Sequence, residues 1–251
     1  MNDFENNDYQ LRANEADFFR DKGYAGPFTV MPPEEMAELR RYIDEELLTT
    51  DGPSHNRLQS RHMDSRRIAE LACHPAIISR MANLYGPDLI MWATYFFCKG
   101  PGGVEIPWHQ DLSYWPLEPL INISAWIAID KVTVENSCVQ LIPGSHKAVY
   151  PTVKSSPDMA FATMTEPDCI DHSKVVNMEL EPGQFFIFNE KTLHHSEPNR
   201  SNKRRMGMSV RVTLPIVKIG QDEAPLHPKH CAILACGKDY MGLNRLMDVP
   251  R

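Results

Sequence analysis

A change of hydrophobic period near residue 88 limits the possible folds of this chain more than any other feature. Before that point, apolar residues recur at helical spacing and predict helices over residues 33–48 and 65–85, the second with a break at Pro75. After it, aromatic and β-branched residues stand in short runs separated by Pro, Gly and Asn, which predicts strands. The expected strands cover residues 89–98, 121–129, 138–142, 175–180, 184–188 and 206–214. Helices followed by many short strands indicate a mainly β fold with flanking helices, either a barrel or a double sheet.

The length of 251 residues suffices for one large core, so we expect a single domain over residues 1–251. Within it, residues 1–14 are interpreted as a loose polar lead, followed by a short helix within residues 15–24 that ends at a glycine. Residues 147–174 are too long for an ordinary connection and are interpreted as a lid or binding loop. The polar stretch 216–251 is expected to cover the barrel mouth or to form a mobile tail.

The formal net charge of -7 and the lack of a basic stripe argue against nucleic acid or an anionic membrane surface as a partner. No apolar run approaches the length of a membrane span, and the polar, acidic start of the sequence shows no export or transit signal. Six cysteines are scattered without metal or redox spacing and are interpreted as free thiols. These features favour a cytoplasmic location.

A His-x-Asp pair at His109 and Asp111 is the strongest candidate for chemistry. In an extended strand, residues two apart point to the same face, so the imidazole and the carboxylate would converge. A further imidazole, from His194 or its neighbour His195, would complete a face of two nitrogens and one oxygen. Such a face leaves three positions open on an octahedral ion and suits non-haem Fe(II). The same spacing at His62-Met63-Asp64 precedes a predicted helix, where a helix cap is the better interpretation.

Four stretches together resemble the phytanoyl-CoA dioxygenase family. They are the segment His109 to Trp126, the turn Ile142-Pro143-Gly144-Ser145-His146, the run Glu181-Pro182-Gly183-Gln184-Phe185, and the stretch from His194 to Arg205. The resemblance implies a double-stranded β-helix, which is the jelly-roll or cupin-like fold. It also implies an Fe(II)- and 2-oxoglutarate-dependent dioxygenase that uses O2. Such an enzyme hydroxylates, or otherwise oxidises, an unactivated C–H bond and releases succinate and CO2.

The resemblance assigns His109, Asp111 and His194 as the iron ligands. His194 is preferred to His195 because the pattern His-x-Ser-x-x-Asn then falls into register. Strand alternation would also turn His195 away from the metal. For the co-substrate, Arg205 matches the family's partner for the distal carboxylate of 2-oxoglutarate, to which a planar guanidinium can donate two parallel hydrogen bonds.

Two further residues are matched to the co-substrate pocket. Ser196 can add a hydroxyl to the same carboxylate, and Trp126 matches the family's aromatic wall, although spacing alone fits a core residue equally well. Arg204 and Arg211 are rivals of Arg205 for the carboxylate. Of these, Arg204 should face the opposite side of the strand and is the better surface charge.

The residue at position 111 bears on the type of reaction. The region from Trp108 to Trp126 resembles a branch of related iron halogenases, which have Ala or Gly at this position to admit chloride. The carboxylate of Asp111 therefore predicts hydroxylation rather than halogenation. One departure from the family pattern is Glu135-Asn136-Ser137, where Gly commonly follows Asn, and this leaves the shape of that turn open.

Six side chains in segments expected near the barrel mouth are candidates for substrate contacts: Arg57, Arg61, Tyr95, Lys99, Tyr114 and Trp115. For each of them a surface charge or a packed aromatic is the plainer interpretation. Cations there would suit a carboxylate-bearing small molecule, such as an amino acid or a natural-product intermediate. The sequence leaves open a carrier protein that tethers the substrate, and a homo-oligomer.

Two other functions stay open at this point. A zinc hydrolase or lyase could use the same ligands with a bound water, but it gives Arg205 and Ser196 no role. A non-catalytic jelly-roll binding protein is expected to lack metal-site residues, which this chain has.

Overall fold

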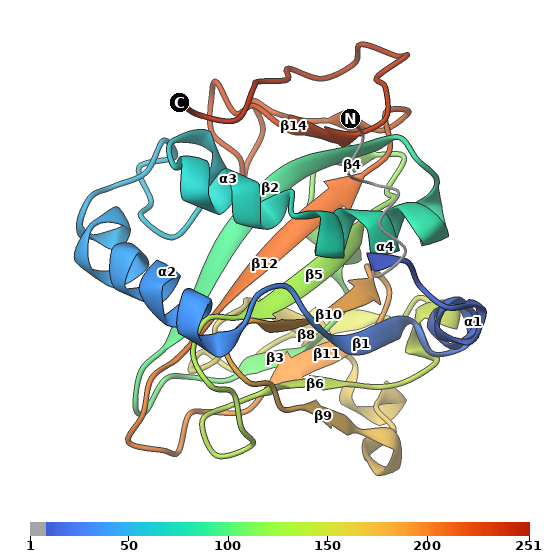
Figure 1. The fold of residues 1–251 in the computed structure, drawn as a ribbon. Helices are drawn as coiled ribbons and strands as arrows, with labels where there is room; N and C mark the ends of the chain where they lie inside the picture. Colours follow the sequence, from blue (N-terminus) through green and yellow to red (C-terminus); the bar gives the residue numbers. More distant parts are fainter. Residues whose placement is uncertain (1–8) are drawn as a thin grey trace.

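The computed structural model describes residues 9–251. Apart from one early strand, helices come first in the described chain and strands follow (Figure 1). The helices are α1 Ala13–Lys22, α2 Pro33–Glu45, α3 Arg66–Ala72 and α4 Pro75–Tyr85. Short 3₁₀ turns lie at Leu47–Thr49, Arg61–Met63, Asp111–Ser113, Ser145–Lys147, Pro167–Cys169 and His172–Lys174. The last of the helices ends at Gly86, close to the change of period in the sequence.

The two longer predicted helical stretches are confirmed, and local signals set their bounds. Pro33 begins α2, where a missing N–H has no intrahelical partner to lose, and two glutamates follow at the positive end of the helix dipole. The Ser65 hydroxyl accepts a hydrogen bond from Ile68 N and so caps α3. Pro75 begins α4 after the predicted break. Each helix buries an apolar face against the larger sheet.

Two antiparallel sheets form the body of the molecule. The larger has the order β1-β10-β5-β12-β2-β14, with bounds Tyr24–Thr29, Gln184–Asn189, Ile123–Ala128, Arg205–Thr213, Leu89–Lys99 and Ile233–Cys236. The smaller has the order β3-β11-β6-β9, with bounds Ile106–His109, His194–Ser196, Val139–Leu141 and Val176–Met178. Two further pairs are β4 Leu117–Glu118 with β13 Lys218–Ile219, and β7 Thr152–Lys154 with β8 Thr163–Thr165. All six predicted strands are present, and the jelly-roll double sheet is confirmed.

The two faces of the larger sheet have different partners. Helices α2, α3 and α4 cover one face (Figure 1), where the even-numbered residues of β12 from Met206 to Val212 lie in the main core. The odd-numbered residues of β12 face the smaller sheet, and this side carries Arg205, Ser209 and Arg211. A strand buried on both faces therefore brings a polar stripe into the interior of the barrel.

The lead expected over residues 1–14 differs from the prediction where it is described. Leu11 packs against the main core, and its N–H donates to Asn83 Oδ1 at 2.8 Å. Helix α1 begins at Ala13 rather than after residue 14. Residues 1–8 lie outside the described residues.

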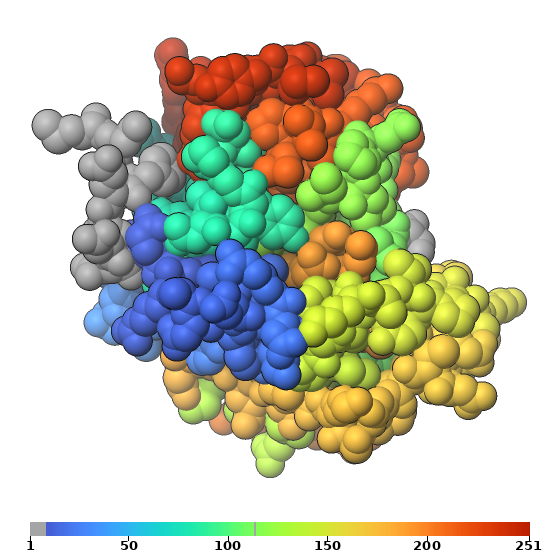
Figure 2. Space-filling view, turned by 90° about the vertical axis from the view of Figure 1, so that its right-hand side faces the viewer, coloured from blue at the N-terminus to red at the C-terminus, as the bar shows by residue number. Residues whose placement is uncertain are grey.

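The two other irregular stretches lie against the barrel. Residues 147–174 contain the β7–β8 pair and reach the interior through Phe161, whose ring centroid lies 4.9 Å from that of His109. Their role as a lid stays a prediction. Residues 216–251 pair with the sheets through β13 and β14, and Figure 2 shows them in red over the top of the molecule. Their role as a cover of the barrel mouth stays a prediction. None of the helices between residues 9 and 251 has the length and apolar character that crossing a bilayer requires.

Candidate active site

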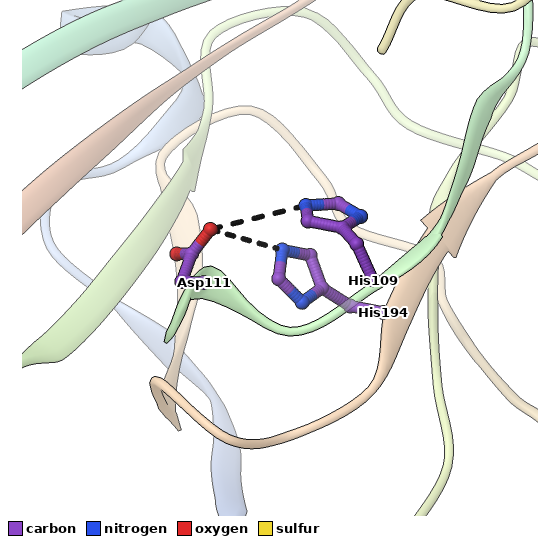
Figure 3. Close-up of side chains that lie close together, drawn as sticks. All are labelled: His109, Asp111 and His194. Carbon is purple, nitrogen blue, oxygen red and sulfur yellow. Dashed lines mark ion pairs between the residues drawn. The ribbon is translucent and has the colours of Figure 1, made fainter. Parts of the chain in front are cut away.

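Three side chains far apart in the sequence meet inside the barrel: His109, Asp111 and His194 (Figure 3). Asp111 Oδ1 lies 3.8 Å from His109 Nε2 and 4.0 Å from His194 Nε2. One possible ligand atom from each residue lies within 4.8 Å of the others. Strand register explains the meeting, because His194 on β11 pairs directly with His109 on β3.

The route by which Asp111 reaches the histidines differs from the prediction. Strand β3 ends at His109, and Asp111 begins the 3₁₀ turn that follows. The N–H of Asp111 donates to Glu190 O at 2.9 Å, which fixes the start of the turn against the loop before β11. A tight turn, rather than alternation along one strand, brings the carboxylate to face the imidazoles.

Hydrogen bonds aim both imidazoles at the same point. His109 Nδ1 lies 2.8 Å from Pro107 O, and His194 Nδ1 lies 2.9 Å from Thr192 O. A carbonyl oxygen only accepts, so each Nδ1 carries the proton and each Nε2 presents its lone pair toward Asp111. Asp111 Oδ2 is buried and meets no donor at hydrogen-bond geometry among residues 9–251, although the nearby Trp115 indole helps to lower the pKa of Asp111. The three groups are thus held for a ligand that none of the described side chains supplies.

The electrostatics keep these groups in the ligating form. Burial, with a smaller effect of His194, lowers the pKa of His109 to about 3, and burial also lowers the pKa of His194. Burial would raise the pKa of Asp111, but the interactions with His194 and with the charged Arg211 outweigh it, and the pKa lies below its usual value. At neutral pH the site therefore offers two neutral imidazoles and one carboxylate, a donor set that fits Fe(II).

The neighbouring His195 is turned away from this cluster, as alternation predicts. Its Nε2 lies 2.9 Å from Glu105 Oε1 and its Nδ1 lies 2.9 Å from Gln140 Oε1. Its ring stacks on Trp108, with the centroids 4.8 Å apart. Both nitrogens of His195 therefore have partners, and the choice of His194 agrees with the geometry.

Arg205 is buried without an acidic partner. It is 1% exposed, and no Asp or Glu of the described chain forms an ion pair with it. Its Nε donates to Ser137 O at 2.9 Å, and its guanidinium carbon lies 5.4 Å from the Trp126 ring centroid. Burial lowers the pKa of Arg205 only to about 10, so the group stays charged at neutral pH. A buried, unpaired cation is costly, and the arrangement suits a bound carboxylate.

Arg204, one residue earlier, faces the opposite side of the strand as predicted. Its guanidinium bonds both oxygens of Asp44, at 2.6 and 3.0 Å, and both oxygens of Asp130, at 2.9 and 3.1 Å. These pairs tie β12 to helix α2. Arg204 is therefore a structural residue and is excluded as a rival for the co-substrate.

Trp126 and Ser196 both lie on the wall of the cavity beside Arg205. The Trp126 ring lies across β12 at Gly207, where an added Cβ would come 2.1 Å from Trp126 Cζ2. The Ser196 hydroxyl accepts a hydrogen bond from Lys99 Nζ at 2.8 Å. The cavity wall near Arg205 thus includes the aromatic ring of Trp126 and the hydroxyl of Ser196.

Lys99 is misplaced in the prediction, which put it among substrate residues at the barrel mouth. The structure buries it behind Ser196, where its ammonium also donates to Ser137 Oγ at 2.9 Å and to Glu197 O at 2.7 Å. Burial and the charge of Arg205 lower the pKa of Lys99 to about 7. It belongs to the end of the cavity where Arg205 lies.

The turn Glu135-Asn136-Ser137 keeps a shape that suits glycine. Ser137 has a φ of 80°, in the left-handed region, and its carbonyl is the acceptor for Arg205 Nε. Its hydroxyl donates to Glu197 O. The serine therefore supports the Arg205 site despite the departure from the family pattern.

The cluster of His109, Asp111 and His194 lines one cavity together with Arg205, and its volume of about 490 Å³ is ordinary for a small-molecule site. Three substrate candidates, Tyr95, Tyr114 and Trp115, lie on its wall. The wall also includes residues that sequence reasoning did not propose for substrate contact, namely Phe161, Phe188, Ser209 and Arg211. Alternation from Arg205 along β12 is the signal that could have found Ser209 and Arg211, whereas nothing in the loop sequence singles out Phe161.

Two substrate candidates, Arg57 and Arg61, do not line the cavity. Arg57 is exposed and does not line the cavity. Arg61 is 3% exposed and outside the cavity, where it donates to Leu47 O at 2.6 Å and pairs with Asp64 at 3.0 Å. The Arg61 guanidinium thus stabilises the loop after helix α2. This structural role cannot be recognised from the presence of an arginine in the sequence.

Comparison with known proteins gives consistent matches. The family model for phytanoyl-CoA dioxygenase (PhyH) matches residues 19–207. Dioxygenase lolE1 of Epichloe uncinata is 32% identical over 136 residues, which are 54% of this chain and 50% of that protein. The peroxisomal phytanoyl-CoA dioxygenase of Homo sapiens is 25% identical over 145 residues, which are 54% of this chain and 42% of that protein. The chain spans about half the length of the curated relatives it matches.

Solved structures agree over more of the chain. CytC3 with Fe(II) and alpha-ketoglutarate has 27% sequence identity and a TM-score of 0.74, and the match covers 95% of this chain and 93% of that one. The apo form of the non-heme monooxygenase ThoJ shares the fold, with 24% identity, a TM-score of 0.77 and 94% and 88% coverage. Since the family model matches most of the residues, this chain belongs to the phytanoyl-CoA dioxygenase family.

Proposed function

We propose that this protein is an Fe(II)- and 2-oxoglutarate-dependent dioxygenase that hydroxylates an unactivated C–H bond of a small molecule. His109, Asp111 and His194 would hold the iron, and Arg205 would bind the distal carboxylate of 2-oxoglutarate. When bound, the iron and its co-substrate would supply the oxidising chemistry, with release of succinate and CO2.

The single observation that carries this proposal is the coexistence of two incomplete sites in one cavity. One is the cluster of two Nε2 atoms and the Asp111 carboxylate, all buried and facing one another. The other is Arg205, a buried guanidinium with no carboxylate partner in the described chain. A keto acid that reaches a metal with one end and a guanidinium with the other would complete both.

The residues of the chain would position the co-substrate, neutralise its distal carboxylate and shield the metal site from water. Arg205 and the Ser196 hydroxyl would hold the distal carboxylate, and the Trp126 ring would pack against the carbon chain of the co-substrate. The aromatic walls at Tyr114 and Phe161 would exclude water and leave room for one C–H bond beside the metal.

The Asp111 carboxylate favours hydroxylation over halogenation. Its Oδ1 already faces both imidazoles, at 3.8 Å from His109 Nε2 and 4.0 Å from His194 Nε2. With that donor present, a halide would have to compete with a carboxylate held in place by the protein. Turnover with added chloride or bromide tests this point, and a halogenated product from the unmutated protein would overturn it.

The decisive experiment is spectroscopic. Anaerobic addition of Fe(II) and 2-oxoglutarate should produce a visible charge-transfer band, and admission of O2 with substrate should convert 2-oxoglutarate to succinate. Tight zinc binding without such a band would favour the zinc hydrolase instead. The Arg205 site argues against that alternative, because a metal-bound water needs no remote guanidinium. Whether the substrate is free, amino-acid-like or tethered to a carrier protein is open to a metabolite screen for 2-oxoglutarate consumption.

A further inference from the structure

A second buried guanidinium, that of Arg211, lies in the same cavity. Arg211 is 5% exposed and lines the wall. Its Nη1 donates to Ser209 Oγ at 2.7 Å, and its guanidinium carbon lies 4.0 Å from the Trp115 ring centroid. Its Nε is buried and has no hydrogen-bond partner among the described residues. No acidic side chain between residues 9 and 251 forms an ion pair with Arg211.

The charge of Arg211 is only partly compensated. Burial lowers its pKa, and Asp111 is the carboxylate whose charge opposes that effect. Asp111 and Arg211 nevertheless form no ion pair in the described chain, and in the proposed function the Asp111 carboxylate also binds iron. Holding a cation in a buried position without an anion is costly, so the arrangement indicates an anion brought by a ligand.

Arg205 and Arg211 serve different parts of the cavity. They lie six residues apart on one face of β12, which corresponds to about 20 Å along an extended strand. Arg205 lies beside Ser137 and Trp126, whereas Arg211 lies beside Trp115. A 2-oxoglutarate anchored at Arg205 places its keto-acid end on the metal, and the metal compensates that charge. In this proposal Arg211 is therefore left for a second anion.

We infer that Arg211 anchors a carboxylate of the substrate that is oxidised. This inference rests on the proposed function and adds the chemical class of its substrate. One guanidinium matches a singly charged, planar carboxylate, to which it can donate two parallel hydrogen bonds. The apolar part of the substrate would lie against Trp115, Tyr95 and Pro225, which form the neighbouring wall. Tyr95 lies opposite Ser209 in the register of β2 and β12, so the anchor and the wall are set by adjacent strands.

The test compares acids with amides of the same shape. The probes are 3-phenylpropionate with 3-phenylpropanamide and 4-methylpentanoate with 4-methylpentanamide, because the wall is aromatic and apolar. Calorimetry on the oxygen-free enzyme loaded with Fe(II) and 2-oxoglutarate gives the Kd of each. In the unmutated enzyme each acid should bind about tenfold or more tightly than its amide, the usual effect of a charge-assisted hydrogen bond.

Two variants separate the two arginines. Arg211→Gln should reduce the acid-to-amide preference to about one and leave the Kd of 2-oxoglutarate within about twofold of the parent. Arg205→Gln should do the reverse. Arg211→Lys retains a point charge but not the planar pair of donors, so it should retain part of the preference, and it serves if the glutamine variant does not fold.

Three results would overturn the inference. Equal binding of acids and amides by the unmutated enzyme would show that no anion subsite exists. Loss of 2-oxoglutarate affinity in Arg211→Gln to the extent seen in Arg205→Gln would assign Arg211 to the co-substrate. An unchanged acid preference in Arg211→Gln would give it a structural role. If the parent enzyme fails to bind 2-oxoglutarate at all, the proposed function fails separately, and the acid and amide probes still test Arg211 on the metal-free protein.

Discussion

Two His-x-Asp pairs with identical spacing occur in this chain, and their surroundings differ completely. At the first, His62 lies 3.1 Å from Thr94 Oγ1 and 3.1 Å from Cys231 O, and Asp64 pairs with Arg61. At the second, His109 has one ring nitrogen bonded to a backbone carbonyl and the other facing Asp111.

The difference teaches that spacing identifies neither pair as a metal site. Both histidines are buried, and burial lowers the pKa of each to about 3. What separates them is the number of polar atoms left without a protein partner. The polar atoms of His62 and Asp64 bond to other parts of the fold. Asp111 Oδ2 and the facing Nε2 atoms of His109 and His194 remain for a ligand.

The strongest way to break this comparison is to replace the two histidines in turn. His109→Gln removes one of three proposed ligands, so Fe(II) affinity and 2-oxoglutarate turnover should fall by more than about 100-fold. His62→Gln should lower the free energy of unfolding by about 1–3 kcal/mol, through loss of buried hydrogen bonds, and retain full iron stoichiometry. Metal analysis after gel filtration, with urea unfolding, measures both. Loss of iron in the His62 variant alone would reverse the assignment of the two motifs.

The sequence predicts the elements of this fold well because each rests on local periodicity. The helix cap at Ser65 and the strand from Leu89 follow from neighbours in sequence. The direction of a side chain after the end of a strand depends instead on tertiary contacts. Asp111 reaches the histidines through a turn held by Glu190, which no spacing rule contains.

The positions of charged side chains are predicted less well than strands, because they too depend on tertiary contacts. Arg61 and Lys99 are cations that the sequence places at the barrel mouth, yet the first holds backbone carbonyls and the second lies behind Ser196. A long side chain can reach several partners, and only the packed structure decides which. Arg211, in contrast, lies in the predicted strand 206–214 and in phase with Arg205 just before it, so alternation does indicate its side of the sheet.

Arg204 and Arg205, at the start of β12, give the same contrast between a residue with partners in the fold and a residue free for a ligand. Arg205→Gln should raise the Kd of 2-oxoglutarate by about 10- to 100-fold, because the variant loses a charge-assisted, two-donor contact. Arg204→Gln should leave that Kd unchanged and reduce the free energy of unfolding, since it breaks the pairs with Asp44 and Asp130. Anaerobic titration of the charge-transfer band gives the Kd. Equal loss of co-substrate affinity in both variants would contradict the distinction between paired and unpaired arginines.

Acid should weaken the metal-free protein through both buried histidines. Their pKa of about 3 in the folded state lies below the value near 6.5 of the unfolded chain. Between these values the unfolded state binds more protons, so the free energy of unfolding falls as pH drops below about 6.5. Each histidine contributes up to about 1.4 kcal/mol per pH unit.

Urea unfolding at pH 7 and pH 5.5 measures this slope. His62→Gln should remove one histidine's share and leave that of His109, and His55→Gln, at an exposed position, is the matched control substitution. Added Fe(II) should steepen the loss in acid, because protons then compete with the metal for His109 and His194. A profile independent of pH over this interval would show that the histidines are not desolvated in the folded protein.

The smallest effect on stability is expected at Ser137. Two substitutions there distinguish the contribution of the hydrogen-bonded hydroxyl from that of the left-handed backbone. Ser137→Ala loses the hydrogen bonds to Lys99 and Glu197 and keeps the φ of 80°. Ser137→Gly loses the same bonds but suits that φ, so it should be more stable than the alanine variant by about 1 kcal/mol. Thermal unfolding of the two variants side by side measures the difference. If the alanine variant were the more stable, the left-handed backbone at this turn would not favour glycine.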